Sequence, residues 1–239
     1  MVEIKNLTKK YGKVKANDDL SFTIPDGQIT VLLGPNGAGK STAIKAMIGV
    51  LRYSGVITVD NFGNKTPEAK RLLGYIPEMP ALYQNLTVKE HLEFVARAYK
   101  LTDYKDYERE LLERFELWDK RNKFGDELSK GMQQKLSICC GLLPKPKFLL
   151  FDEPMVGLDP HAIKELKEVF TELKNDGCAV LISTHMIDSI ENLWDKTIIM
   201  QSGRVKAQVL KADIEKSGES LEDIFFAVTE PENGGGADE

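Results

Sequence analysis

A glycine-rich segment directly after an apolar run most strongly constrains how this chain folds. It reads GPNGAGKST over residues 34–42, follows ITVLL and leads into a helix that we predict over residues 40–49. This is the strand, loop and helix order that the phosphate-binding pattern GxxxxGK[ST] requires. The glycines let backbone N–H groups point at phosphates, Lys40 supplies a positive charge, and the Ser41 hydroxyl can ligate Mg²⁺. The pattern should arise by chance about once in a hundred chains of this length, so a plain glycine-rich turn is the weaker interpretation.

Acidic residues follow a second apolar run. The segment FLLFDEP ends with Asp152 and Glu153, and two carboxylates beside a core are costly without a cation or a reacting water nearby. By themselves, two acids after a strand more often begin a loop or a helix. Together with a phosphate loop, they predict that Asp152 holds Mg²⁺ and that Glu153 polarises an attacking water.

A histidine follows a third apolar run, in AVLISTHM. An isolated histidine at such a position is more often structural than functional. In parallel α/β sheets, however, ligands bind beyond the carboxyl ends of the strands. Gly34, Asp152 and His185 each stand at or just beyond the end of such a strand, so we predict that these three segments meet at one site.

Strand and helix patterns alternate along the chain, with one interruption. Between residues 87 and 143 helical periodicity takes over, and it opens with a capping-box pattern at Thr87 and Glu90. Strands that are apolar throughout and alternate with helices predict an α/β fold with a mostly parallel sheet buried on both faces. Toward the C-terminus the patterns indicate a hairpin over residues 197–208, an amphipathic helix over 220–228 and a disordered acidic tail over 229–239.

Composition excludes several classes of protein. A net charge of -5 and a pI near 5.4 argue against a nucleic-acid partner, because binding to a phosphate backbone needs clustered Lys and Arg. The apolar runs fall far short of the roughly 20 residues that cross a bilayer, and the N-terminus lacks a signal-peptide core. We therefore expect a cytoplasmic protein. Three cysteines without metal-ligand spacing fit a reducing compartment and predict packing roles.

Taken in order, these motifs resemble those of the ATP-binding subunit of an ABC transporter, and the resemblance extends from about Val2 to Val228. GPNGAGKST is similar to the family's Walker A motif, FLLFDE to its Walker B motif, and GLDP over residues 157–160 to its D-loop. LSKGM stands where the LSGGQ signature belongs, and His185 where the family has its switch histidine. Tyr11 stands where the family places a ring against adenine; the alternative for Tyr11 is a half-buried strand residue.

The resemblance implies ATP and Mg²⁺ as the bound groups, and it implies a role for each matching residue. The implied catalytic residues are Glu153, His185 and Glu78, and the implied metal ligands are Ser41, Asp152 and Glu78. The residues implied to bind ATP in the same chain are Tyr11, Gly34, Pro35, Asn36, Gly37, Ala38, Gly39, Lys40, Ser41 and Thr42. Those implied to contact ATP held by a second chain are Ser129, Lys130, Gly131, Met132 and Asp159.

Two departures from the family pattern fall within the implied site. Lys130 and Met132 stand where glycine and glutamine are usual, and Lys130 either adds a positive charge near the phosphates or is simply solvated. In GYIPE, Glu78 replaces the glutamine that normally links Mg²⁺ and the attacking water to the transport subunit. A carboxylate there puts the neutral-amide role in question. The alternative for Glu78 is an exposed loop acid.

The resemblance also implies the architecture. We expect a single P-loop NTPase domain over residues 1–239, in which the mostly parallel core sheet is joined by an N-terminal antiparallel β subdomain and an inserted α-helical subdomain. The expected divisions are the ATP-binding core at 1–77 and 146–213, the helical subdomain at 78–145, a C-terminal helix at 214–228 and a disordered tail at 229–239.

In this family two ATP-binding subunits pair head to tail, so that each signature caps the γ-phosphate of ATP held by the other chain. The resemblance thus implies two partners. One is a second copy or a related ATP-binding subunit, and the other is a separate transmembrane permease, contacted near residues 78–87, that holds the chain at the inner face of the cell membrane. GYIPE, LSKGM and SLEDIFF are most similar to subunits of ABC-2-type exporters. The alternative is a non-transport ABC ATPase that acts on a soluble protein or a ribosomal complex.

Overall fold

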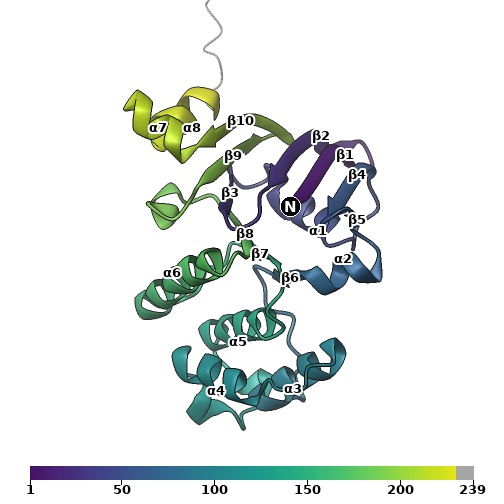
Figure 1. The fold of residues 1–239 in the computed structure, drawn as a ribbon, viewed down its shortest axis with the longest axis vertical. Coiled ribbons are helices and arrows are strands. Elements are labelled where there is room, and N and C mark those ends of the chain that lie inside the picture. The colour runs from purple at the N-terminus through teal and green to yellow at the C-terminus, as the bar shows by residue number, and fades with distance from the viewer. Residues whose placement is uncertain (230–239) are drawn as a thin grey trace, which may run out of the picture.

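A computed structural model describes residues 1–229, so the tail predicted for residues 229–239 lies outside the described part except for Thr229, which ends the last helix. The larger of two sheets has six strands in the order β10-β9-β3-β8-β7-β6 (Figure 1). Its strands are β3 (Ile29–Leu33), β6 (Leu73–Ile76), β7 (Phe148–Asp152), β8 (Ala179–Thr184), β9 (Lys196–Gln201) and β10 (Arg204–Leu210). Only the β9–β10 pair is antiparallel among the strand pairs of the described sheet. The predicted α/β fold with a mostly parallel sheet is confirmed, as is the hairpin near the C-terminus.

The smaller sheet lies at the N-terminal side of the molecule (Figure 1). It consists of β1 (Val2–Tyr11), β2 (Val14–Ile24), β4 (Ser54–Val59) and β5 (Phe62–Gly63), in the order β2-β1-β4-β5. All of its pairings are antiparallel. The antiparallel N-terminal sheet that the family resemblance implied is therefore present.

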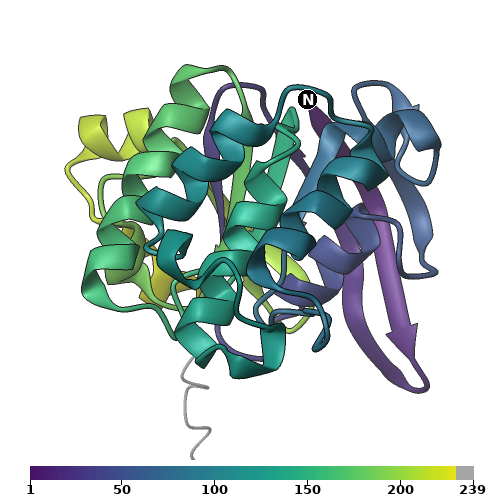
Figure 2. The same ribbon diagram turned by 90° about the horizontal axis from the view of Figure 1, so that it is seen from below.

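The helices pack around the larger sheet. They are α1 (Lys40–Met47), α2 (Pro67–Leu72), α3 (Val88–Tyr99), α4 (Lys105–Arg114), α5 (Lys130–Leu142), α6 (Pro160–Asn175), α7 (Lys211–Ser217) and α8 (Leu221–Thr229). Three short 3₁₀ turns occur among the described residues, at Trp118–Lys120, Gly125–Glu127 and Ile187–Ile190. Seen from below, the helices of residues 88–142 form a layer in front of the sheet (Figure 2). No described helix is both long enough and apolar enough to span a bilayer.

Residues of the central strands alternate between two cores, one on each face of the sheet. In β7, Leu149 and Phe151 pack with the helices of residues 88–175, whereas Phe148 and Leu150 pack with α1 and the smaller sheet. Every residue of β3, β7 and β8 is buried. Because successive side chains of a strand point to opposite faces, covering both faces favours apolar residues at nearly every position. This explains the nearly continuous apolar runs in the sequence.

Local capping fixes where the inserted helices begin. Thr87 and Glu90 form the predicted capping box at the start of α3, and the Ser129 hydroxyl accepts a hydrogen bond from Met132 N (3.3 Å) at the start of α5. Such caps satisfy backbone donors that have no partner within the helix. The start of α5 therefore follows from its sequence.

The predicted C-terminal helix over residues 214–228 is wrong in its extent. The structure has two helices there, because α7 ends at a left-handed Gly218 (φ 76°) and α8 begins afresh at Leu221. A glycine in this conformation is a common helix terminator. The amphipathic helix predicted over residues 220–228 corresponds to α8.

Candidate functional site

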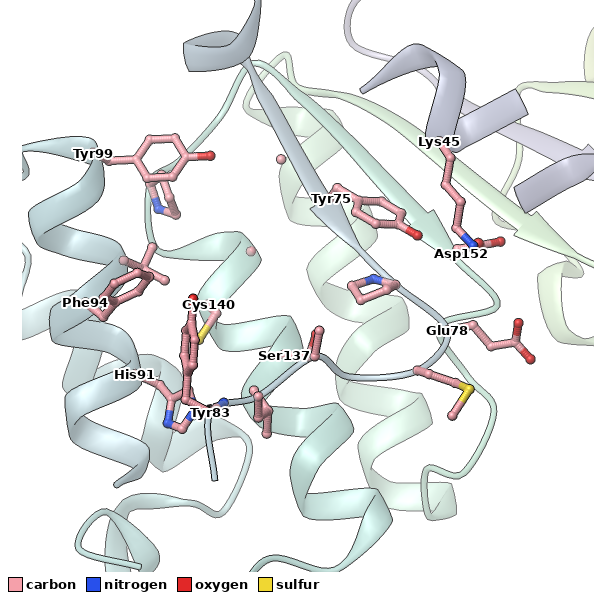
Figure 3. Close-up of a pocket in the computed structure, with 18 residues that line it drawn as sticks. Lys45, Tyr75, Glu78, Tyr83, His91, Phe94, Tyr99, Ser137, Cys140 and Asp152 are labelled. Atoms are coloured by element: carbon pink, nitrogen blue, oxygen red, sulfur yellow. Dashed lines mark hydrogen bonds between the residues drawn. The ribbon is translucent and has the colours of Figure 1, made fainter. Parts of the chain in front are cut away.

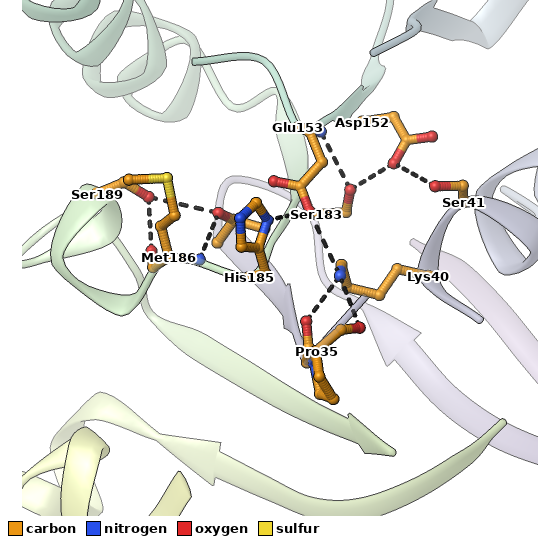
Figure 4. A network of polar contacts seen from close by, with 11 residues as sticks. Pro35, Lys40, Ser41, Asp152, Glu153, Ser183, His185, Met186 and Ser189 are labelled. Carbon is orange, nitrogen blue, oxygen red and sulfur yellow. Dashed lines mark hydrogen bonds and ion pairs between the residues drawn. The ribbon is translucent and has the colours of Figure 1, made fainter. Parts of the chain in front are cut away.

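Three strand ends converge at one edge of the larger sheet. Strands β3, β8 and β7 are neighbours and parallel, with Leu33 opposite Thr184 and Asp152 opposite Ser183. Because parallel strands place their carboxyl ends at the same edge, the segments that follow them lie side by side. The phosphate loop (residues 34–42), the pair Asp152 and Glu153, and His185 meet there (Figure 4).

The phosphate loop curls tightly beneath the start of α1. Gly37 and Gly39 have positive φ values of 81° and 98°. A Cβ atom at Gly39 would lie 2.2 Å from Ala16 O, and one at Gly34 would lie 2.3 Å from Met200 O, so only glycine fits at either position. The N-terminus of α1 has no side-chain cap, which leaves its first N–H groups as donors for an anion. The loop therefore fits a phosphate.

A cavity of about 630 Å³ lies over this loop, and we call it the phosphate-loop cavity. It gathers predicted residues from five separate parts of the chain. Its lining residues are Tyr11, Ala16, Asn36, Gly37, Ala38, Gly39, Lys40, Ser41, Thr42, Glu78, Glu153, Val156 and His185. Tyr11 is 50 % exposed and carries Lys9 Nζ 4.6 Å from its ring centroid, so the ring has a free face available for stacking.

Asp152 is buried at the end of β7 and is bound by two hydroxyl groups. Ser41 Oγ donates to Asp152 Oδ1 at 3.0 Å, and Ser183 Oγ donates to the same oxygen at 2.6 Å. Carboxylate and hydroxyl oxygens are the ligands that Mg²⁺ prefers, with water and phosphate completing its shell. No group of three or more described His, Cys, Asp or Glu side chains is placed to hold a metal ion. By the chemistry of their oxygens, Ser41 and Asp152 fit as part of a Mg²⁺ site whose other ligands are water and phosphate.

Lys40, Glu153 and His185 form a second polar group beside Asp152 (Figure 4). Lys40 Nζ lies 3.4 Å from Glu153 Oε1 and donates to the carbonyl oxygens of Gly34 (2.7 Å) and Pro35 (3.3 Å). His185 Nδ1 lies 3.1 Å from the same Glu153 oxygen. Glu153 has a left-handed backbone (φ 47°), a conformation that costs energy in a non-glycine residue and is concentrated at functional sites. The carboxylate therefore sits between an ammonium group and an imidazole.

Glu78 lies where two hollows of the surface meet. It lines the phosphate-loop cavity, and it also lines a neighbouring groove of about 620 Å³, which we call the side groove (Figure 3). Burial raises the pKa of the Tyr75 hydroxyl, and the carboxylates of Asp152 and Glu78 raise it further. Glu78 is exposed, and it shares the lining of the side groove with Asp152.

The signature turn (residues 129–132) lies outside the phosphate-loop cavity of its own chain. It contacts the D-loop (residues 157–160) instead: a Cβ atom at Gly131 would lie 3.0 Å from Gly157 O. Lys130 is exposed at the start of α5, and Met132 is half-buried against the helical core. Asp159 caps α6 by accepting from Ala162 N at 2.8 Å. The structure thus brings the predicted residues together as two separate groups.

Ser183 is the site residue that reasoning from the sequence missed. Besides its bond to Asp152, its hydroxyl accepts from Glu153 N at 3.2 Å, and its carbonyl accepts from the same N–H at 3.1 Å. It therefore fixes the Asp152 carboxylate directly and the backbone of Glu153. The signal in the sequence was its place two residues before His185, but recognising it requires the register that sets Ser183 opposite Asp152.

Comparison with known proteins agrees with these motifs. Residues 17–156 match the ABC transporter family. The chain is similar to the ABC-type transporter ATP-binding protein EcsA of Bacillus subtilis (strain 168), with 35 % identity over 243 residues and 98 % of each chain covered.

Solved structures show the same architecture. One, described as the ATP-binding subunit of an ABC transporter, is 36 % identical, superposes with a TM-score of 0.90, and is matched over 96 % of this chain and 100 % of its own length. Another is a dimeric ATP-binding cassette in a post-hydrolysis state bound to ADP and Pi. It is 26 % identical with a TM-score of 0.80, and the match covers 88 % of this chain and 98 % of that one.

Proposed function

Because the chain belongs to the ABC transporter family, it is an ATP-hydrolysing subunit, and we propose that it drives a separate membrane-spanning permease as half of an ATP-bridged dimer. The phosphate-loop cavity, which gathers Lys40, Ser41, Glu78, Glu153 and His185, carries this proposal. We further propose that the described helices and sheets form one ATP-binding domain held at the inner face of the membrane through the permease. The sequence pattern favours export.

In the proposed site the chain binds the phosphates of ATP through backbone N–H groups and a positively charged side chain. The free N–H groups at the start of α1 and the Lys40 ammonium face the phosphates, and the exposed Tyr11 ring stacks on the adenine. Ser41 and Asp152 would hold Mg²⁺, which when bound neutralises phosphate charge and favours departure of the leaving group. Ser183 keeps the Asp152 carboxylate oriented toward Ser41.

The proposed general base is Glu153. Its carboxylate can accept a proton from an attacking water because it lies in the same cavity as the phosphate loop. As the Nδ1–H tautomer, His185 donates a hydrogen bond to this carboxylate and orients it. Glu153 is 7 % exposed, and low exposure strengthens the charge interactions around it.

We propose that the signature turn and Asp159 act on ATP held by a second copy of the chain. The turn lies outside its own phosphate-loop cavity, and at the start of α5 the Ser129 hydroxyl caps Met132 N while the N–H groups of Lys130 and Gly131 remain available as donors. Two copies related by a two-fold axis would each supply one signature turn to the other, which yields two composite sites. ATP binding would then close the dimer, and hydrolysis would open it.

The permease is proposed to dock in the side groove (Figure 3). The groove runs between β6 and the helices α3 and α5, and its rim exposes the apolar side chains of Met79 (81 %), Tyr83 (56 %) and Phe94 (50 %). Tyr83 and Phe94 pack edge to face, with ring centroids 5.3 Å apart. A contiguous exposed apolar surface of this kind is typical of an interaction site. Glu78, at its end, connects the groove to the phosphate-loop cavity.

A groove variant tests the permease proposal. The chain is co-expressed with a candidate membrane protein of about six apolar spans of roughly 20 residues each, encoded beside its gene, and the detergent-solubilised complex is purified. Phe94→Asp should abolish co-purification, because it places a charge in the apolar contact. Phe62→Asp, which alters a similarly exposed aromatic (44 %) on β5 outside the groove, should leave the complex intact. A stable Phe94→Asp complex would contradict the docking site, and the wild-type chain purifying with soluble or ribosomal proteins instead would favour a non-transport ATPase.

Glu78→Gln tests whether this carboxylate contributes to metal binding. Removing one negative charge from the cavity should raise the Mg²⁺ concentration for half-maximal ATP hydrolysis by about threefold or more. The measurement is a Mg²⁺ titration of ATPase rate at saturating ATP, with the exposed Glu215→Gln on α7 as the control for loss of a distant charge. Superimposable titrations would show that Glu78 is a surface acid without a metal role.

A further inference from the structure

A buried lysine joins the signature helix to the D-loop. Lys135 lies on α5 and is 7 % exposed. Its Nζ lies 2.9 Å from Asp159 Oδ2 and 3.0 Å from Glu116 Oε2. Lys135 is thus the common partner of a D-loop carboxylate and of a carboxylate two residues beyond the end of α4.

Asp159 is held from two sides. Oδ1 accepts from Ala162 N and so caps α6, while Oδ2 pairs with Lys135. These contacts, first the Ala162 N–H and then the Lys135 ammonium, hold the pKa of the Asp159 carboxyl below its usual value. Since both oxygens are engaged, Asp159 is fixed relative to α5 as well as to its own helix.

The backbones of the two segments also meet. A Cβ atom added at Gly131 would lie 3.0 Å from Gly157 O, so the signature turn and the D-loop backbone approach each other closely on that side. The turn and the D-loop are therefore close together at one point through their backbones and are joined at a second by the pair of Lys135 and Asp159. The close approach at the first point limits how far one segment can pivot about the ion pair at the second.

We propose that Lys135 is a positioning residue that holds the signature turn and the D-loop as one rigid unit, so that both reach ATP on the partner chain together. This inference rests on the proposed dimer function, in which both segments act across the interface. Lys135 itself lies outside the phosphate-loop cavity and is not proposed to touch nucleotide.

Lys135→Met tests this role because it removes the ion pairs of Lys135 and keeps the packing of its side chain. Methionine matches the length of the buried stem and removes the charge, so no unpaired charge is left in the interior. The two former partners can be hydrated, because the side chains of Glu116 and Asp159 are 61 % and 51 % exposed. Lys135→Arg keeps the positive charge and serves as the conservative variant.

The first measurement is hydrogen–deuterium exchange of the nucleotide-free chain, which needs no dimer. Lys135→Met should raise exchange in peptides that cover residues 129–133 and 154–159, and Lys135→Arg should restore protection. Exchange in the phosphate loop should stay unchanged. Equal exchange in wild type and Lys135→Met, in both segments, overturns the inference whether or not the chain dimerises.

The second measurement is ATP-dependent dimerisation in the Glu153→Gln background, by analytical ultracentrifugation. Adding Lys135→Met should weaken the dimer about tenfold or more while ATP affinity of the monomer stays within about twofold. Adding Lys135→Arg should leave dimerisation near that of Glu153→Gln. Undiminished dimerisation with Lys135→Met overturns the inference. A monomeric Glu153→Gln chain at saturating ATP overturns the proposed shared site instead, and the exchange result then decides the role of Lys135.

Discussion

Glu153→Gln should reduce ATP hydrolysis by about 10²- to 10⁴-fold, the usual contribution of a general base, and leave ATP binding largely intact. Glutamine has nearly the same shape but cannot accept the proton of an attacking water. Lys40 keeps its hydrogen bonds to Gly34 O and Pro35 O in the variant, so the phosphate loop should retain its conformation. Because hydrolysis opens the proposed dimer, ATP-bound dimers should accumulate.

The measurement combines steady-state ATPase rate, ATP affinity by calorimetry and size-exclusion chromatography with saturating ATP. Glu68→Gln is the matched control, since it makes the same change on the exposed face of α2, away from the site. A Glu153→Gln chain that hydrolyses ATP at the control rate would remove Glu153 from its proposed role. Loss of hydrolysis with the chain remaining monomeric would leave the base in place but contradict dimer closure by the chain alone.

The larger sheet could be predicted because burial on both faces leaves an unambiguous pattern. The runs ITVLL, FLLF and AVLIS correspond to β3, β7 and β8, whose residues are all buried. Their common carboxyl edge followed from parallel pairing, and so did the meeting of Gly34, Asp152 and His185. The extent of the C-terminal helix was harder to predict, because the amphipathic periodicity continues across Gly218. The break between α7 and α8 depends on the left-handed conformation of that glycine.

Details that depend on register or on side-chain packing could not be predicted. The role of Ser183 requires knowing that it stands opposite Asp152. His91 is a similar case at the side groove: its Nε2 accepts from Tyr83 N at 2.9 Å and its Nδ1 donates to Thr87 O at 2.8 Å, so this buried ring shapes the groove. The sequence pattern gives the apolar face of α3 but does not show which loop folds back onto it.

Two defective chains can show whether the signature turn serves the partner's ATP. Lys40→Ala should lower ATP affinity by about ten- to a hundredfold, because a charge-assisted contact to the phosphates is lost, and its signature turn remains intact. Ser129→Arg should bind ATP normally but present a blocked signature turn. Each variant alone should hydrolyse ATP at a small fraction of the wild-type rate, since every dimer then has the same defect in both sites.

Mixing the two chains should restore activity, because the heterodimer combines the sound phosphate loop of Ser129→Arg with the sound signature turn of Lys40→Ala. Random pairing makes half of the dimers heterodimers with one whole site each, so an equal mixture should recover up to about a quarter of the wild-type rate. Nucleotide occlusion, measured in parallel, detects one intact site even when hydrolysis requires both sites of the dimer to be intact. If the signature turn served its own chain, neither chain would contribute a whole site to any mixture. Zero recovery and zero occlusion, in mixtures shown to contain heterodimers, would therefore place the action of Ser129 within its own chain.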